Sequence, residues 1–266
     1  MSDPTDTPLI PDLVFTVAIT GHQDIAPAQA AALQTQITGL LETIRARICT
    51  ACAPGHSATN PFDAGRATRF RFVTALAPGA DQIGARAALA TTQDGPDDPR
   101  RWRLNVILPF DRDTYAALAR ATLRDKGLDD AIITAAIEAI DTLAAQADRV
   151  LELTDRASGV GDVLATHDRA RQSRRYATLG QMLVRQADLL IALWDGAPAR
   201  GPGGTAEVVS EARRSGVPVV WIDPARPGDA RSFVPDAGTA HPPISGAAAA
   251  LDRAVAHVLH DGGAAG

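Results

Sequence analysis

Short apolar runs alternate along the chain with longer segments in which apolar and polar residues recur at helical spacing. The apolar runs lie at residues 13–20, 70–75, 102–108, 188–194 and 217–222. Runs of this kind are typical of strands that helices cover on both faces, and their alternation with helices predicts a parallel sheet. We therefore predict an α/β fold, with a Rossmann-like, doubly wound, mainly parallel five-stranded sheet and helices on both of its faces.

The segments between these runs have the periodicity of helices. The first of them opens with Pro27 and carries one apolar stripe, which should cover the sheet. Residues 149–153 suit a short edge strand. Because the alternation continues without a break, we expect one domain over residues 13–261, after a disordered lead at residues 1–12. The predicted helices span residues 27–49, 81–90, 112–124, 130–146, 162–187, 205–215 and 244–260.

Three of the predicted strands end in loops that contain glycine and polar residues. Gly-His-Gln-Asp follows the first strand at residues 21–24, residues 76–81 follow the second, and Asp195 and a glycine-rich stretch at 201–204 follow the fourth. The common strand order of a doubly wound sheet, 3-2-1-4-5, makes the first and fourth strands parallel neighbours at the sheet centre. This order places the three loops around one crevice at the carboxyl edge of the sheet.

The loop before the helix at residues 205–215 has the features of an anion site. Gly203 and Gly204 have no side chains, so their amides can approach a ligand closely, and Thr205 is a good N-cap residue. The free N–H groups of the first helical turn carry partial positive charge, which favours phosphate. A turn whose glycines serve only the backbone geometry is the alternative interpretation.

Charged side chains near the three loops are candidates for further ligand contacts. Asp81 and Asp195 are poorly placed for phosphate, but a carboxylate there can accept hydrogen bonds from ribose hydroxyls or from a base N–H. Arg174 or Arg175 should reach the crevice and pair with phosphate, because their helix ends directly before the fourth strand. Basic side chains in a row on one helix face are, however, more often exposed to solvent without binding a ligand.

Composition and charge exclude several classes of function. The chain has 266 residues and a formal net charge of -5, so it has no overall attraction for nucleic acid or anionic membranes. No apolar run approaches the ~20 residues that cross a bilayer, and the acidic N-terminal stretch does not have the pattern of a signal peptide. We expect a cytoplasmic protein without nucleic-acid or membrane partners.

Cys49 and Cys52 form a Cys-x-x-Cys pair, with His56 nearby. A structural zinc site needs four ligands, and the sequence has no second cysteine pair. The pair also falls near the end of a predicted helix, whereas helix N-termini are the places that activate thiolates. We therefore expect two reduced cysteines, no metal and no cofactor.

An ordered set of motifs resembles the Smf/DprA and LOG superfamily, called SLOG. The set consists of ITGHQD at residues 19–24, TALAPGAD at 74–81, LPF at 108–110, and ADLLIALWDG at 187–196 followed by GPGGTAE. The resemblance covers about residues 14–222, and its specificity lies in the order of the pieces. It implies a Rossmann-like domain that binds a nucleotide or a nucleotide-derived ligand, closest in pattern to YpsA-like and sensor-type members.

The resemblance implies two alternative functions. LOG phosphoribohydrolases carry P-G-G-x-G-T-x-x-E, in which the glutamate and an arginine from a preceding helix serve cleavage of an N-glycosidic bond. Here T-A-E follows P-G-G directly at residues 205–207, so the second G-T pair is missing and the carboxylate arrives three residues early. This shorter form resembles binding-type members. We therefore favour a sensor over a nucleoside monophosphate phosphoribohydrolase, in which Glu207 and Arg175 would be catalytic.

A sensor of this kind would bind an ADP-ribose-like or cyclic nucleotide and signal through a homo-oligomer or a separate effector protein. Glu207 can contact a ribose hydroxyl in the binding reading or act as a general acid in the enzyme reading. DNA handling is disfavoured by the acidic charge balance. The predicted ligand-binding residues are Gly21, His22, Leu76, Gly79, Asp81, Asp195, Gly203, Gly204, Thr205, Glu207 and Arg174.

Overall fold

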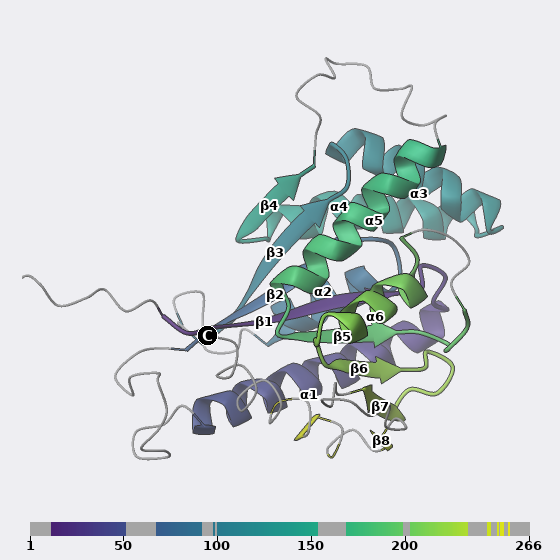
Figure 1. The fold of residues 1–266 in the computed structure, drawn as a ribbon. Coiled ribbons are helices and arrows are strands. Elements are labelled where there is room, and N and C mark those ends of the chain that lie inside the picture. Colours follow the sequence, from purple (N-terminus) through teal and green to yellow (C-terminus); the bar gives the residue numbers. More distant parts are fainter. Residues whose placement is uncertain are drawn as a thin grey trace, which may run out of the picture.

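A computed structural model contains an eight-stranded sheet in the order β4-β3-β2-β1-β5-β6-β7-β8 (Figure 1). Strands β1 to β6 are parallel, whereas β7 is antiparallel to β6 and β8 is antiparallel to β7. The strands are β1 (Val14–Gly21), β2 (Arg69–Thr74), β3 (Trp102–Leu108), β4 (Arg149–Glu152), β5 (Leu189–Leu193), β6 (Val219–Ile222), β7 (Ala230–Phe233) and β8 (Ile244–Ser245). The structure describes residues 12–51, 68–91, 98, 100–153, 169–198, 203–233, 244–245, 249, 251–252 and 255.

The α/β class and the mainly parallel sheet are confirmed. The five predicted strands are β1, β2, β3, β5 and β6, and the short edge strand expected at residues 149–153 is β4. The five-stranded sheet with the order 3-2-1-4-5 is wrong as a complete description, because β4 extends one edge and β7 and β8 extend the other. The sequence of β7, Ala-Arg-Ser-Phe, contains charged and polar residues, so no continuous apolar run marks this antiparallel edge.

The expectation of a helix over residues 244–260 is wrong at its start. Ile244 and Ser245 form β8, since pairing with β7 overrides the local helical pattern. Residues 249, 251, 252 and 255 are helical, and Leu251 and Val255 are buried in the core. Several other expectations fall outside the described residues: the lead at residues 1–11, Cys52 and His56, the start of the helix expected from residue 162, and residues 201–202.

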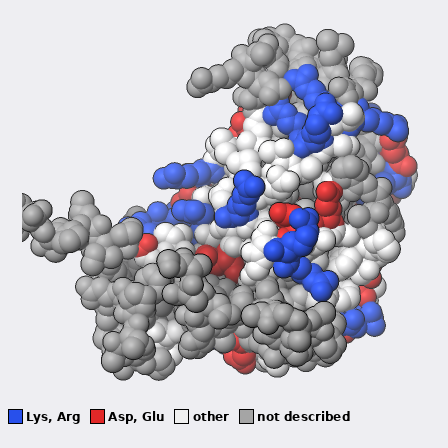
Figure 2. Space-filling model, viewed as in Figure 1, with Lys and Arg blue, Asp and Glu red and all other residues white. Residues whose placement is uncertain are grey.

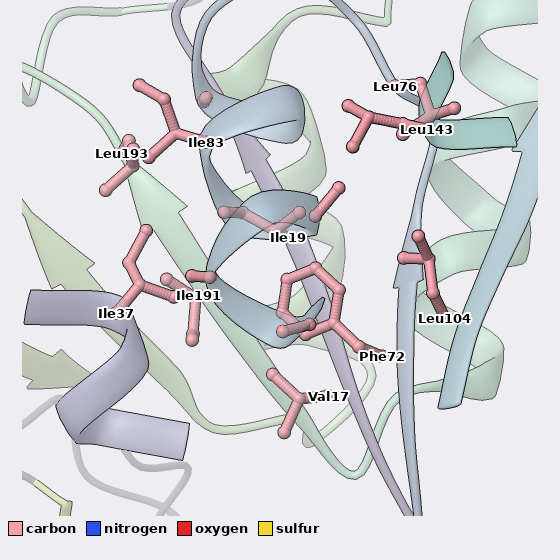
Figure 3. Packing of buried hydrophobic residues seen from close by; sticks show 14 of the residues in the cluster. Val17, Ile19, Ile37, Phe72, Leu76, Ile83, Leu104, Leu143, Ile191 and Leu193 are labelled. Carbon is pink, nitrogen blue, oxygen red and sulfur yellow. The ribbon is translucent and has the colours of Figure 1, made fainter. Parts of the chain in front are cut away.

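Helices lie on both faces of the sheet (Figure 1). Their bounds are α1 (Pro27–Ala51), α2 (Ala80–Ala90), α3 (Arg112–Asp125), α4 (Asp130–Ala145), α5 (Arg169–Gln186) and α6 (Thr205–Arg214). One core lies between the sheet and α1 to α4, and a second lies between the sheet and α5 and α6. Figure 3 shows the first core, where Ile37 of α1 packs near Ile191 of β5 and Phe72 of β2 packs near Ile19 of β1.

An aspartate directly before β5 sets the register at the centre of the sheet. The Asp188 carboxylate accepts a hydrogen bond from the Thr16 amide at 2.7 Å, and the Asp188 amide donates to the Thr16 carbonyl at 2.8 Å. Burial raises the pKa of Asp188, although the hydrogen bond from Thr16 and the charge of Arg71 act in the opposite direction. The resulting parallel register places Gly21 opposite Leu193, as the predicted adjacency of the first and fourth strands requires. The loops after β1 and β5 therefore lie side by side.

Charged residues are mixed on the surface. On the face shown in Figure 2, basic side chains lie in several separate groups with acidic side chains between them. None of the described helices is both long enough and apolar enough to cross a bilayer.

Candidate functional site

A cavity of about 440 Å³ lies at the carboxyl ends of β1, β2 and β5. The chain leaves β1 toward β2 on one side and leaves β5 toward β6 on the other, so this is the switch point at which open α/β sheets bind ligands. All three predicted loops contribute to the lining. The predicted residues that line the cavity are Gly21, His22, Asp81, Asp195, Gly203, Gly204 and Thr205.

The end of β1 is closely packed around Gly21. A Cβ atom at this position would lie 2.4 Å from the Ala80 Cβ and 2.6 Å from the Leu193 carbonyl oxygen. The next residue, His22, donates its amide to the same Leu193 carbonyl at 3.0 Å. Gly21 is therefore required by the close approach of β1, β5 and α2, whatever the cavity binds.

His22 and Asp195 are brought together on the cavity rim. The Nε2 atom of His22 lies 3.1 Å from both the amide nitrogen and the Oδ1 atom of Asp195. Neutral Nε2 can accept the Asp195 amide hydrogen, whereas protonated Nε2 can donate to the carboxylate. Oδ1 also accepts from the Ala197 amide at 2.9 Å, which holds the carboxylate over the start of the loop.

Asp81 holds the loop between β2 and α2 in a turned-back conformation. It lies in the first turn of α2, its side chain is buried, and its Oδ2 atom accepts from the Ala75 amide at 3.0 Å. Two predicted residues of this loop, Leu76 and Gly79, do not line the cavity. Both have left-handed backbones, with φ of 55° and 79°, and a Cβ at Gly79 would lie 2.4 Å from the His22 carbonyl oxygen. They shape the loop, and Ala75, Ala77 and Asp81 are the residues of this segment that line the cavity.

The pKa of Asp81 predicts a pH-dependent stability. Burial raises this pKa to about 7, although hydrogen bonds from the amides of Ala75 and Ala77 and from Thr74 act in the opposite direction. Because the folded-state pKa lies above the unfolded value, the contribution of Asp81 to stability is present at low pH and is lost as the pH rises toward 7. Asp81→Asn should abolish this loss, so the variant should gain about 2 kcal/mol relative to wild type between pH 5 and pH 8.

Urea unfolding of both proteins at the two pH values measures this gain. Asp141→Asn is the control, since the Asp141 side chain is 69% exposed. A constant difference between Asp81→Asn and wild type at pH 5 and pH 8 would contradict the assignment.

The loop before α6 is shaped by Gly203 and closed by Glu207. Gly203 has φ of 79°, and a Cβ there would lie 2.5 Å from the Tyr176 Cβ. Its amide donates to the Glu207 carboxylate, so this amide, which we expected to face a ligand, already has a partner. Glu207 itself does not line the cavity. Its carboxylate instead closes the turn that precedes α6.

The first turn of α6 retains free hydrogen-bond donors. The N-cap residue is Gly204 and not Thr205 as predicted, because the helix already begins at Thr205, and no described side chain caps it. The amides of Gly204, Thr205 and Ala206 have no hydrogen-bond partner within the described part of the chain, and all three residues line the cavity. These amides are the positive end of the helix that a ligand can reach.

Neither predicted arginine lines the cavity. Arg175 donates to the Leu153 carbonyl at the end of β4, and its guanidinium lies 5.7 Å from the centre of the Phe110 ring. Arg174 is exposed. The expectation that one of them reaches the crevice is therefore corrected, because α5 presents a different face, with Tyr176 and Gly180, to the cavity.

A wall from α3 was missed by the sequence analysis. Tyr115, Thr122 and Lys126 line the cavity, and their spacing of seven and four residues places them on one helical face. This spacing in the sequence was the signal from which the wall could have been predicted. Lys126 pairs with Asp24 at 3.2 Å, so the end of α3 is tied to the loop after β1. Burial alone would raise the pKa of Asp24, but the charge of Lys126 and its hydrogen bond outweigh burial and lower it.

Two tyrosines stand where the α3 wall meets α5. Tyr115 is 2% exposed, and Tyr176 packs edge-to-face on Phe110 with ring centres 5.9 Å apart. Burial, together with the nearby Tyr176 and Asp81, raises the pKa of Tyr115 well above its ordinary value, and burial raises that of Tyr176 to about 12. Both hydroxyl groups are therefore neutral at pH 7 and can donate as well as accept hydrogen bonds.

The described residues contain no group of three or more His, Cys, Asp or Glu side chains suited to a metal ion. Cys49 is a free thiol in this part of the chain. Compared with models of known protein families and with curated proteins, the chain matches none.

Proposed function

We propose that this protein binds or senses a nucleotide or a nucleotide-derived ligand at the carboxyl edge of its sheet. The main support for this proposal is the cavity at the switch point, into which the first turn of α6 directs unpaired amides. The amides of Gly204, Thr205 and Ala206 can donate to phosphate oxygens, and the partial positive charge of the helix terminus favours the anion.

The charges around the cavity support a phosphate held by amides and not by cations. Among the described lining residues, Asp24, Asp81 and Asp195 are acidic and Lys126 is the lysine that opposes them. Its charge is already paired with Asp24. The phosphate group therefore belongs at α6, while the Asp195 carboxylate lines the cavity and can accept hydrogen bonds from ribose hydroxyls. The cavity volume of about 440 Å³ lies within the usual range for small-molecule sites.

The resemblance to the SLOG superfamily supports the same ligand class. The motifs ITGHQD, TALAPGAD and GPGGTAE include the loops after β1, after β2 and before α6, which surround the cavity. Membership of that superfamily is part of this proposal, and so is a signal passed through a homo-oligomer or a separate effector protein.

Binding is favoured over N-glycosidic hydrolysis by the two candidate catalytic residues. The Glu207 carboxylate bonds the Gly203 amide outside the cavity lining, and the Arg175 guanidinium bonds the Leu153 carbonyl. A phosphoribohydrolase of the LOG type needs a carboxylate that can reach the sugar carbon or its leaving base. Neither side chain has that position here.

The test is a thermal-shift panel of nucleoside monophosphates, cyclic nucleotides and ADP-ribose, with chromatography to detect free base. We expect a stabilising shift with at least one of these ligands and no base release. Glu207→Gln replaces a charged acceptor of the Gly203 amide with a neutral one, which should loosen the loop and weaken binding about fivefold.

Glu138→Gln on the exposed face of α4 is the matched control and should leave the affinity unchanged. Rapid release of free base that depends on Glu207 would defeat the sensor proposal and favour the glycosidase.

A further inference from the structure

We infer that the α3 wall and the side chain of Gln23 form a subsite that recognises the nucleoside part of the ligand through its N–H and O–H donors. This inference rests on the proposed function, because it assigns the second half of a ligand whose phosphate lies at α6. Gln23 and Tyr115, the two residues that carry it, do not belong to the predicted binding set.

The first observation is an unsatisfied acceptor in the cavity lining. Gln23 lines the cavity, and its Oε1 atom is buried without a hydrogen-bond partner among the described residues. A buried acceptor without a partner destabilises the site, because it has lost its hydrogen bonds to water. A ligand N–H or O–H group that reaches Oε1 would remove this destabilisation, so the position favours a donor over an anion.

The second observation is the neutral hydroxyl of Tyr115. This side chain lines the cavity from α3, and in the described part of the molecule its hydroxyl makes no hydrogen bond. The nearby Asp81 also lines the cavity, and one of its carboxylate oxygens accepts from the Ala75 amide. Gln23 Oε1 and the Tyr115 hydroxyl can therefore both accept hydrogen bonds, which matches amino and hydroxyl groups of a ligand.

The electrostatics of this wall exclude phosphate from it. Lys126, at the end of α3, is neutralised by Asp24 at 3.2 Å. Asp81 would add repulsion whenever it is ionised. The free amides lie elsewhere, on α6, which packs on the opposite face of the sheet from Tyr115. The ligand is therefore oriented with its phosphate toward α6 and its nucleoside toward α3.

Isothermal titration with the four ribonucleoside 5′-monophosphates and with ribose 5-phosphate distinguishes binding of the nucleoside from binding of the phosphate. Wild type should bind at least one monophosphate more tightly than ribose 5-phosphate. Tyr115→Phe and Gln23→Leu should each weaken the affinity for that nucleotide about tenfold, the equivalent of one buried hydrogen bond. Each should change the affinity for ribose 5-phosphate less than twofold. Gln146→Leu, at the exposed end of α4, is the control and should change neither.

Circular dichroism and thermal unfolding verify that each variant is folded. Tyr115→Phe should keep the wild-type melting temperature, because the hydroxyl that it lacks has no protein partner. Unchanged nucleotide affinity in both variants, or an equal loss for the nucleotide and ribose 5-phosphate, would overturn the subsite and leave the proposed function standing. If wild type binds no monophosphate, this inference fails, and the proposed function fails with it only if the cyclic nucleotides and ADP-ribose of the thermal-shift panel do not bind either.

Discussion

Gly204→Val is expected to abolish nucleotide binding while the chain remains folded. Gly204 lines the cavity at the N-cap of α6, with φ of -75° and ψ of 165°, an extended conformation that valine adopts readily. The new side chain would stand among the free amides of the first helical turn and exclude a phosphate group from them. We expect at least a ~100-fold loss of affinity, since about 3 kcal/mol of charge-assisted hydrogen bonding is lost.

The stability cost of this substitution should be small. Replacing the N-cap glycine by a β-branched residue weakens the cap by about 1 kcal/mol, which lowers the melting temperature without unfolding the protein. Gly39→Val is the matched control, because Gly39 lies on α1 and a Cβ there meets nothing within 4 Å. Titration calorimetry and thermal unfolding of both variants provide the comparison. Wild-type affinity in Gly204→Val would show that phosphate is not held at this helix terminus.

Gly21→Ala should destabilise the fold by about 3 kcal/mol, the upper part of the range for overpacking in a core. The added methyl group would lie 2.4 Å from the Ala80 Cβ and 2.6 Å from the Leu193 carbonyl oxygen. A backbone carbonyl cannot change rotamer to make room, so β1 and β5 must separate or α2 must shift. Because Gly21 of β1 and Asp81 of α2 line the cavity, ligand binding should weaken together with stability.

Urea unfolding at constant pH measures this cost. Gly39→Ala carries the same substitution at a position without close neighbours and should stabilise α1 by roughly 0.5–1 kcal/mol. A Gly21→Ala protein within 0.5 kcal/mol of wild type would mean that the strands tolerate more separation than their packing indicates.

The order of the central elements follows from local signals in the sequence. The strands β1, β2, β3, β5 and β6 are covered on both faces, so their residues form apolar runs that can be recognised without any tertiary contact. The common topology of doubly wound sheets then predicts that β1 and β5 are neighbours, and the register of Gly21 opposite Leu193 confirms it. The position of the cavity at the ends of these strands was predictable for the same reason.

Strands that are buried on one face only, or that are defined by a single strand pairing, could not be predicted from the sequence. The strands β7 and β8 lie at the antiparallel edge, and β8 has only two residues, so the pairing itself and not a hydrophobic pattern defines them. A helical pattern over residues 244–260 could not exclude this pairing, because short segments take the structure that their neighbours impose.

The sequence by itself determined that three glycine-bearing loops meet at one sheet edge, because strand order and direction follow from short-range patterns. Only the tertiary structure decided which groups of those loops remain free. The Glu207 carboxylate occupies the Gly203 amide, and the Arg175 guanidinium turns to the Leu153 carbonyl. Tyr115 reaches the cavity from α3, outside all three of these loops. Hydrogen bonds and rotamers of this kind are set by three-dimensional neighbours, which residue spacing along one chain does not encode.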